Sequence, residues 1–99
     1  MLKDFRNADK PIALCCISPV IAAKVFPGCS VTIGNDSGTA NAIESVGSKN
    51  EERKVTEVCV DEKNKIVTSP AYMYGDAPPH EIFDGIQNMI TETLNLIKE

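Results

Sequence analysis

The sequence predicts an α/β layer fold with a mainly parallel sheet. Three observations lead to this prediction. Short runs of apolar and β-branched residues alternate with segments of helical periodicity along the 99 residues. Residues 11–15 are continuously apolar, which is typical of a parallel strand buried on both faces. Residues 78–98 carry apolar side chains at helical spacing. Because this pattern yields only two or three core strands, the chain is too short to form a doubly wound sheet by itself.

The first strand is followed at once by a helix. Residues 1–6 read as the tail of an amphipathic helix, and Pro11 separates them from the strand because proline cannot continue a helix. After the strand, Ser18 is the expected N-cap and Pro19 the first helical residue. Gly28, which follows a proline, ends this helix.

A second strand and a second helix come next. Residues 30–33 are rich in β-branched side chains and predict a short strand. The polar residues 36–39 can cap a helix that runs through Val46 and stops at Gly47. Residues 48–54 are polar and predict a loop.

The remaining sequence predicts a hairpin and a long helix. Residues 55–60 and 66–69 read as two strands joined by the turn at 61–64. Two prolines then open a helix that extends to Lys98. Gly85 lies inside this helix, where glycine costs about 1 kcal/mol relative to alanine.

Charge and hydropathy exclude several classes of partner. The net charge of −4 argues against a nucleic-acid-binding protein, which normally presents a basic face, and gives no polybasic signal for a membrane surface. No apolar run approaches the roughly 18–20 residues that span a bilayer. The first residues, which are charged, do not resemble a signal peptide. We therefore expect no nucleic acid and no membrane among the partners.

The cysteines do not form a metal site. None of the four belongs to a Cys-x-x-Cys pair, and His80 lies far from all of them in sequence. We expect neither a metal nor another cofactor, and the pattern favours free thiols in a reducing compartment.

Chemistry is concentrated in the stretch Pro11-Ile-Ala-Leu-Cys-Cys-Ile-Ser-Pro19. Cys16 stands where a buried strand leads directly into a helix, a turn that pushes a nucleophile into solvent. The positive end of the helix favours the thiolate, and the backbone N–H of Ile17 is placed to stabilise an oxyanion. The predicted catalytic residues are thus Cys16 and Ile17. The alternative is that Cys16 is a buried apolar thiol. A nucleophile elbow usually has small residues two positions before and two positions after the nucleophile. Of these two residues, only Ser18 is small here.

The same stretch resembles a known family. The resemblance is to the ES-1-like mitochondrial proteins and the bacterial ElbB proteins, members of the class 1 glutamine-amidotransferase-like, DJ-1/PfpI superfamily. It covers nearly the whole chain, through residues 2–25, 31–34, 38–40, 60–73 and 84–86.

The resemblance implies a flavodoxin-like three-layer sandwich of which residues 1–99 are the C-terminal half of a single domain. It also implies an elbow cysteine at Cys16 and a glyoxalase III-like conversion of methylglyoxal, a small carbonyl substrate, to lactate in the complete domain. The family's glutamate and glycine-rich loop belong to the N-terminal half. Many superfamily members carry a histidine where this chain has Gly34, so a Cys-His-Glu triad is not expected.

Two further expectations concern role and assembly. The rival function is non-catalytic: redox sensing by oxidation of Cys16, or protein stabilisation. The resemblance implies a mitochondrial location, with the cytoplasm as the alternative. Without its flanking strands the elbow strand should expose an apolar edge, so we expect a homo-oligomer or a complementing chain, and weak folding of the 99 residues in isolation.

We expect structural and not catalytic roles for the other three cysteines, for His80 and for two loop segments. Cys15 should face away from Cys16 into the core, Cys29 should be an accessible loop thiol, and Cys59 should be a buried strand residue. His80 is expected on the surface. Residues 72–74 could line a pocket near the cysteine, although packing is the simpler interpretation, and residues 51–54 should form a solvated loop.

Overall fold

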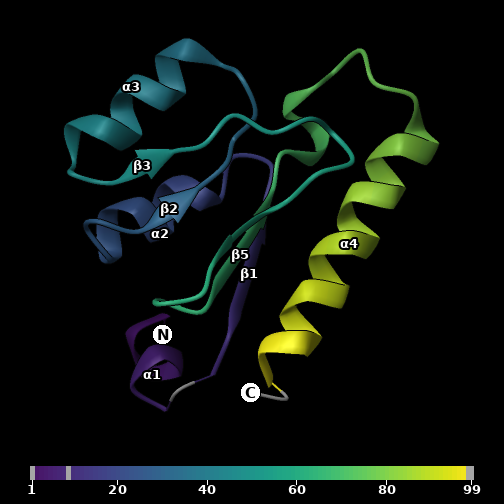
Figure 1. The fold of residues 1–99 in the computed structure, drawn as a ribbon. Coiled ribbons are helices and arrows are strands. Elements are labelled where there is room, and N and C mark those ends of the chain that lie inside the picture. The colour runs from purple at the N-terminus through teal and green to yellow at the C-terminus, as the bar shows by residue number, and fades with distance from the viewer. Residues whose placement is uncertain (1, 9, 98–99) are drawn as a thin grey trace.

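The computed structural model describes residues 2–8 and 10–97, except for a few side chains. Their helices and strands alternate along the chain (Figure 1). In order they are α1 (Leu2–Asn7), β1 (Ile12–Cys15), α2 (Pro19–Val25), β2 (Ser30–Val31), α3 (Ser37–Ser45), β3 (Lys49–Asn50), β4 (Cys59–Asp61), β5 (Ile66–Ser69), the 3-10 helix η1 (Ala71–Met73) and α4 (Pro79–Ile97). None of the helices described is long and apolar enough to cross a membrane.

Two small sheets form the middle layer. In the first, with order β1-β5-β4, β1 pairs parallel with β5 and β4 pairs antiparallel with it. The second consists of β2 and β3 in parallel. A hydrogen bond from the Thr32 N–H to Thr68 Oγ1, 2.9 Å long, joins the β2 segment to β5. The predicted parallel arrangement and the hairpin of β4 and β5 are confirmed.

Helices cover both faces of the main sheet. Adjacent residues of β5 point in opposite directions: Ile66 packs in a core cluster with Ala22, Ala23 and other residues around α2, whereas Val67 packs against α4. Figure 1 shows α4 on one side of the sheet and α2 and α3 on the other. The fold is therefore the α/β type with helical layers on both faces that the sequence predicts.

The strand predicted over residues 55–60 is wrong for its first four residues, because this segment packs against α4 instead of joining the sheet. Val55 is buried in a cluster with Ala71 and Ile82. The side-chain amide of Asn88 donates a 2.8 Å hydrogen bond to the Thr56 carbonyl. The Val55 side chain is thus buried and the Thr56 carbonyl is hydrogen-bonded without a neighbouring strand.

The segments around β2 also differ from the prediction. β2 ends at Val31, two residues early, and the predicted loop at 48–54 contains β3. The Lys49 N–H donates to the Cys29 carbonyl at 2.9 Å, and the Glu51 N–H donates to the Val31 carbonyl at 2.8 Å. These backbone hydrogen bonds define β3, and the types of its side chains do not mark it as a strand. The sequence pattern therefore did not predict it.

Helix boundaries agree closely with the expected signals, with one exception. Asp36 caps α3 by accepting a 3.0 Å hydrogen bond from the Thr39 N–H, as predicted. α2 begins at Pro19 as predicted, but Ser18 makes no capping hydrogen bond because its backbone is already helical and its hydroxyl is bonded to Cys15. The predicted end of the last helix, Lys98, lies outside the described residues.

Candidate functional site

Cys16 lies in a strained turn between β1 and α2. Its φ of +61° is in the left-handed region, which costs a residue with a side chain roughly 1–2 kcal/mol. The turn is held on one side by a 3.0 Å hydrogen bond from the Cys16 N–H to the Ser69 carbonyl at the end of β5. Such strain persists where surrounding contacts impose it, and it concentrates at functional sites. A sharp strand-to-helix turn of this kind is the geometry predicted for a nucleophile elbow.

Ser18 fixes the other side of the turn. Its hydroxyl donates to the Cys15 carbonyl at 2.7 Å and accepts from the Cys15 N–H at 3.1 Å. The Ser18 N–H also donates to the Cys15 carbonyl, at 3.1 Å. The backbone on both sides of Cys16 is thus hydrogen-bonded, so the position of its Cα is defined independently of the thiol.

Ile17, the residue after Cys16, has a free backbone donor. Within residues 2–8 and 10–97, the Ile17 N–H makes no hydrogen bond, and the Ile17 side chain is 52% exposed. A donor at this position can bind a negatively charged oxygen that forms beside the cysteine. The contribution of α2 is limited, since this helix has only 7 residues.

Cys15 and Cys16 share an apolar environment. Both are half-buried and pack against the cluster of Val55, Ala71 and Ile82. Cys15 packs in addition against the cluster of Val67, Met89 and Leu96, in agreement with the predicted core packing, whereas Cys16 does not. Burial, together with the nearby charge of Cys16, raises the pKa of Cys15 above its ordinary value.

Tyr74 occupies the space beside Gly34. A Cβ on Gly34 would lie 2.9 Å from Tyr74 Cε2, and Gly34 has a φ of +84°. The Tyr74 hydroxyl donates a 2.5 Å hydrogen bond to the Arg53 carbonyl. Burial raises the pKa of Tyr74, as do the charges of Glu52 and Glu57, so the phenol stays protonated at neutral pH. Any side chain at position 34 would meet the Tyr74 ring.

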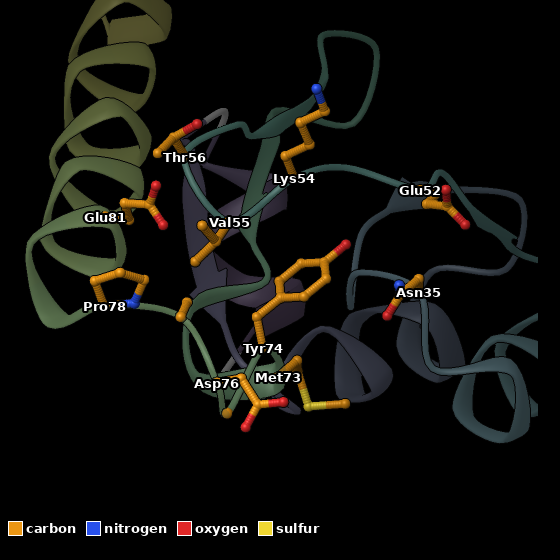
Figure 2. Close-up of a pocket in the computed structure, with 12 residues that line it drawn as sticks. Asn35, Glu52, Lys54, Val55, Thr56, Met73, Tyr74, Asp76, Pro78 and Glu81 are labelled. Atoms are coloured by element: carbon orange, nitrogen blue, oxygen red, sulfur yellow. The ribbon is translucent and has the colours of Figure 1, made fainter.

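Tyr74 also lines a groove of about 820 Å³ (Figure 2). Residues from four segments line it: Asn35, Glu52, Lys54, Val55, Thr56, Met73, Tyr74, Gly75, Asp76, Ala77, Pro78 and Glu81. Val55, Tyr74 and Ala77 belong both to this lining and to the cluster that contacts Cys16, whereas Cys16 does not line the groove. Figure 2 shows the Tyr74 ring between Val55 and Asn35. The groove and the cluster around Cys16 are therefore adjacent and share these side chains.

The groove bears on two interpretations made from the sequence. Met73 and Tyr74 pack against the core clusters, which is the simpler interpretation of residues 72–74, and both also line the groove; the side chain of Tyr72 lies outside the described part of the chain. Glu52 and Lys54 are exposed and lie outside any helix or strand, as predicted for a solvated loop, and they also line the groove. Sequence reasoning did not single out Asn35 as a groove residue, because its closeness to residues 52–56 depends on the long-range pairing of β2 and β3.

The two remaining cysteines are not accessible. The prediction of an accessible Cys29 is wrong: the residue is 0% exposed, and its Sγ lies 3.6 Å from the Ala22 carbonyl oxygen, to which it donates. Cys59 is buried as predicted, and burial raises its pKa to about 12. His80 is exposed, also as predicted. Among the described residues, no group of three His, Cys, Asp or Glu side chains could hold a metal ion.

Known proteins share this sequence and fold. The chain is 46% identical to the ES1 protein homolog, mitochondrial, of Rattus norvegicus over 97% of its own length and 39% of that protein. It is 47% identical to the glutamine amidotransferase-like class 1 domain-containing protein 3, mitochondrial, of Homo sapiens, with the same coverage. It is 35% identical to the ES1 protein, mitochondrial, of Danio rerio over 97% of the chain and 40% of that protein. No family model matches the chain.

A solved structure supports the same relationship. A crystal structure described as an isoprenoid biosynthesis protein with amidotransferase-like domain, from Ehrlichia chaffeensis, superposes with a TM-score of 0.88 at 31% identity. The match covers 97% of this chain and 45% of that one. The chain spans about two fifths of the length of the curated relatives. Over the part that it spans, the chain belongs to the ES1 family of glutamine-amidotransferase-like class 1 proteins.

Proposed function

We propose that Cys16 is the nucleophile of a glyoxalase III-like reaction that converts methylglyoxal to lactate, carried out by a complete ES1-type domain of which this chain is the C-terminal half. The observation that supports it most is the left-handed backbone of Cys16 at the strand-to-helix turn, hydrogen-bonded on both sides. The free N–H of Ile17 beside it adds a donor for an oxyanion.

The chemistry assigns one step to each group. The Cys16 thiolate attacks the aldehyde carbon, a C–S bond forms, and the carbonyl electron pair moves to oxygen as an alkoxide that the Ile17 N–H binds. Protonation gives a hemithioacetal. Transfer of a proton from C1 to C2 through an enediol gives a lactate thioester, and water hydrolyses it to release lactate and the thiol. A carboxylate from outside this chain must carry that proton, since the Tyr74 phenol is engaged with Arg53.

A second candidate function uses the same thiol without turnover. Gly34 stands where many superfamily members carry a histidine, and oxidation of Cys16 by a peroxide to a sulfinic acid, as a redox signal, needs no such base. In that case the Ile17 N–H would bind a sulfinate oxygen instead of an alkoxide. Since three relatives are named as mitochondrial proteins, we propose the mitochondrion as the location for either function.

A chimera of the human relative, with its matching region replaced by this chain, distinguishes the two functions. We expect it to convert methylglyoxal to lactate, and Cys16→Ser to lower the rate at least a hundredfold. Cys15→Ser, the adjacent thiol, serves as the control and should retain most of the activity. A chimera that forms no lactate, yet gains two oxygen atoms at Cys16 when treated with peroxide, would refute the glyoxalase assignment in favour of the redox function.

A further inference from the structure

Cys15 and Cys16 are free thiols on consecutive residues that share one apolar surface. Both side chains are half-buried and contact the cluster of Val55, Ala71 and Ile82. Burial raises the pKa of Cys15, and the charge of Cys16 raises it further, which places the two sulfur atoms within electrostatic reach of each other. The turn thus contains a second thiol that the chemistry proposed for Cys16 does not use.

The other two cysteines are held elsewhere in the fold. Cys29 and Cys59 are each 0% exposed. The Cys29 thiol donates to the Ala22 carbonyl at 3.6 Å, and Cys59 lies in β4, which β5 separates from β1. Of the four cysteines, all of which the structure describes, Cys15 is therefore the thiol that the folded chain offers to Cys16.

The peptide unit between Cys15 and Cys16 is held in place by three hydrogen bonds. Its C=O accepts from the Ser18 hydroxyl at 2.7 Å and from the Ser18 N–H at 3.1 Å. Its N–H donates to the Ser69 carbonyl at 3.0 Å. Consecutive Cα atoms are about 3.8 Å apart, whereas disulfides usually join Cα atoms roughly 4.4–6.8 Å apart, so a disulfide between neighbouring residues is strained. Closing one here would twist this peptide unit and draw its C=O and N–H away from Ser18 and Ser69.

We propose that Cys15 is the resolving thiol of Cys16, so that oxidation by a hydroperoxide ends in a disulfide between the two neighbours. In the first step the Cys16 thiolate takes one oxygen atom from the hydroperoxide, whose O–O bond breaks, and an alcohol or water leaves; Cys16 becomes a sulfenic acid. In the second step the Cys15 sulfur gives up its proton and attacks the Cys16 sulfur, the S–O bond breaks, and water leaves. The two thiols together lose two electrons, which the hydroperoxide accepts.

This inference rests on the second candidate function, because it needs a Cys16 thiol that a hydroperoxide oxidises, and it adds a reversible stage to that function. Strained disulfides are the readily reduced ones, so a cellular thiol restores both cysteines. A sulfinic acid is not restored in this way, and it forms only when the hydroperoxide reacts with the sulfenic acid faster than Cys15 does. The disulfide also releases the Cys16 N–H from Ser69, so the oxidised chain loses the turn that presents the thiol.

The experiment treats the chain with a small molar excess of hydrogen peroxide, labels the remaining thiols with iodoacetamide and digests it with trypsin. The tryptic peptide that ends at Lys24 contains Cys15 and Cys16 and neither of the other cysteines. By mass spectrometry we expect this peptide to lose two hydrogen atoms and to take up no label, and to accept two labels after reduction with dithiothreitol. In Cys15→Ser the same peptide should instead gain two oxygen atoms, which dithiothreitol does not remove.

The outcomes separate the inference from the function on which it rests. A peptide of the unmodified chain that gains two oxygen atoms at Cys16 while Cys15 still takes up the label would overturn the inference and leave redox sensing by Cys16 intact. A Cys16 that peroxide does not oxidise at all would overturn both.

A second variant tests the role of the peptide unit. Ser18→Ala removes the hydroxyl that holds the Cys15 carbonyl in the reduced chain, so in a glutathione redox buffer the ratio of disulfide to dithiol should rise at least threefold. Ser45→Ala is the matched control, since the Ser45 hydroxyl donates to the Ala42 carbonyl within α3, and it should leave the ratio unchanged. Equal ratios in Ser18→Ala and the unmodified chain would contradict a disulfide that closes against these hydrogen bonds.

Discussion

Replacing Gly85 with alanine is expected to destabilise the fold by about 2 kcal/mol, although alanine is the better helix former. A Cβ at this position would overlap the carbonyl oxygen of Val55 and would lie 3.5 Å from Ser69 Oγ. The obstacle is backbone, which cannot move aside as a flexible side chain could. The substitution should therefore push α4 away from the segment that leads into β4. Urea unfolding should show a lower midpoint with little change in the slope.

The matched control is the same substitution in another helix. Gly38 lies in the first turn of α3, where a Cβ would meet only Asp36 Oδ2 at 3.9 Å, an ordinary contact. Gly38→Ala should stabilise the fold by roughly 0.5–1 kcal/mol, because alanine restricts the unfolded chain more than glycine does. Equal effects at the two positions would contradict the close approach of α4 to Val55.

Gly34→Ala is expected to cost about 2 kcal/mol for two separable reasons. The position has a φ of +84°, and its Cβ would lie 2.9 Å from Tyr74 Cε2. The second cost should disappear when Tyr74 is also replaced by alanine, so a double-mutant cycle should give a coupling of about 1 kcal/mol. Strictly additive effects would show that the Tyr74 ring does not fill the space beside Gly34. Coupling would also explain why a histidine cannot simply be introduced there to complete a triad.

The sequence predicts the strand-to-helix turn at Cys16 well because its signals are local. The apolar run at 11–15 and Pro19 define the junction on which Cys16 lies, and the structure gives the expected strand and helix on either side. Asp36 and Gly47 likewise mark the start and end of α3 through capping and a positive φ of +90°. Such signals depend on a few consecutive residues and survive in a short chain.

The sequence-based predictions are wrong where contacts between residues far apart in the sequence determine the structure. Val55 has strand-like character, yet its contacts with Ala71 and Ile82 take it out of the sheet. Cys29 follows a turn, which predicts an accessible loop thiol, but after the left-handed Gly28 it packs in the core with Ala22 and Ala23 and is completely buried. From the sequence, Gly85 carries only the helix-propensity cost of glycine. The structure shows that the Val55 carbonyl leaves no room for a Cβ at this position, so glycine is necessary there. No local pattern contains these contacts, which join segments 7 to 30 positions apart.

The most direct test of the elbow is the rate at which each cysteine of the native chain is alkylated at pH 8, followed by mass spectrometry. We expect Cys16 to react fastest, at least tenfold faster than Cys15, because the turn presents it beside a free N–H. Cys29 should be protected by burial, and Cys59, with its pKa near 12 instead of 9.0, should have about a thousandfold less thiolate. In denaturant the four rates should converge. Four similar rates in the native chain would contradict the account, because they would mean that Cys16 is not held in a distinct and reactive turn.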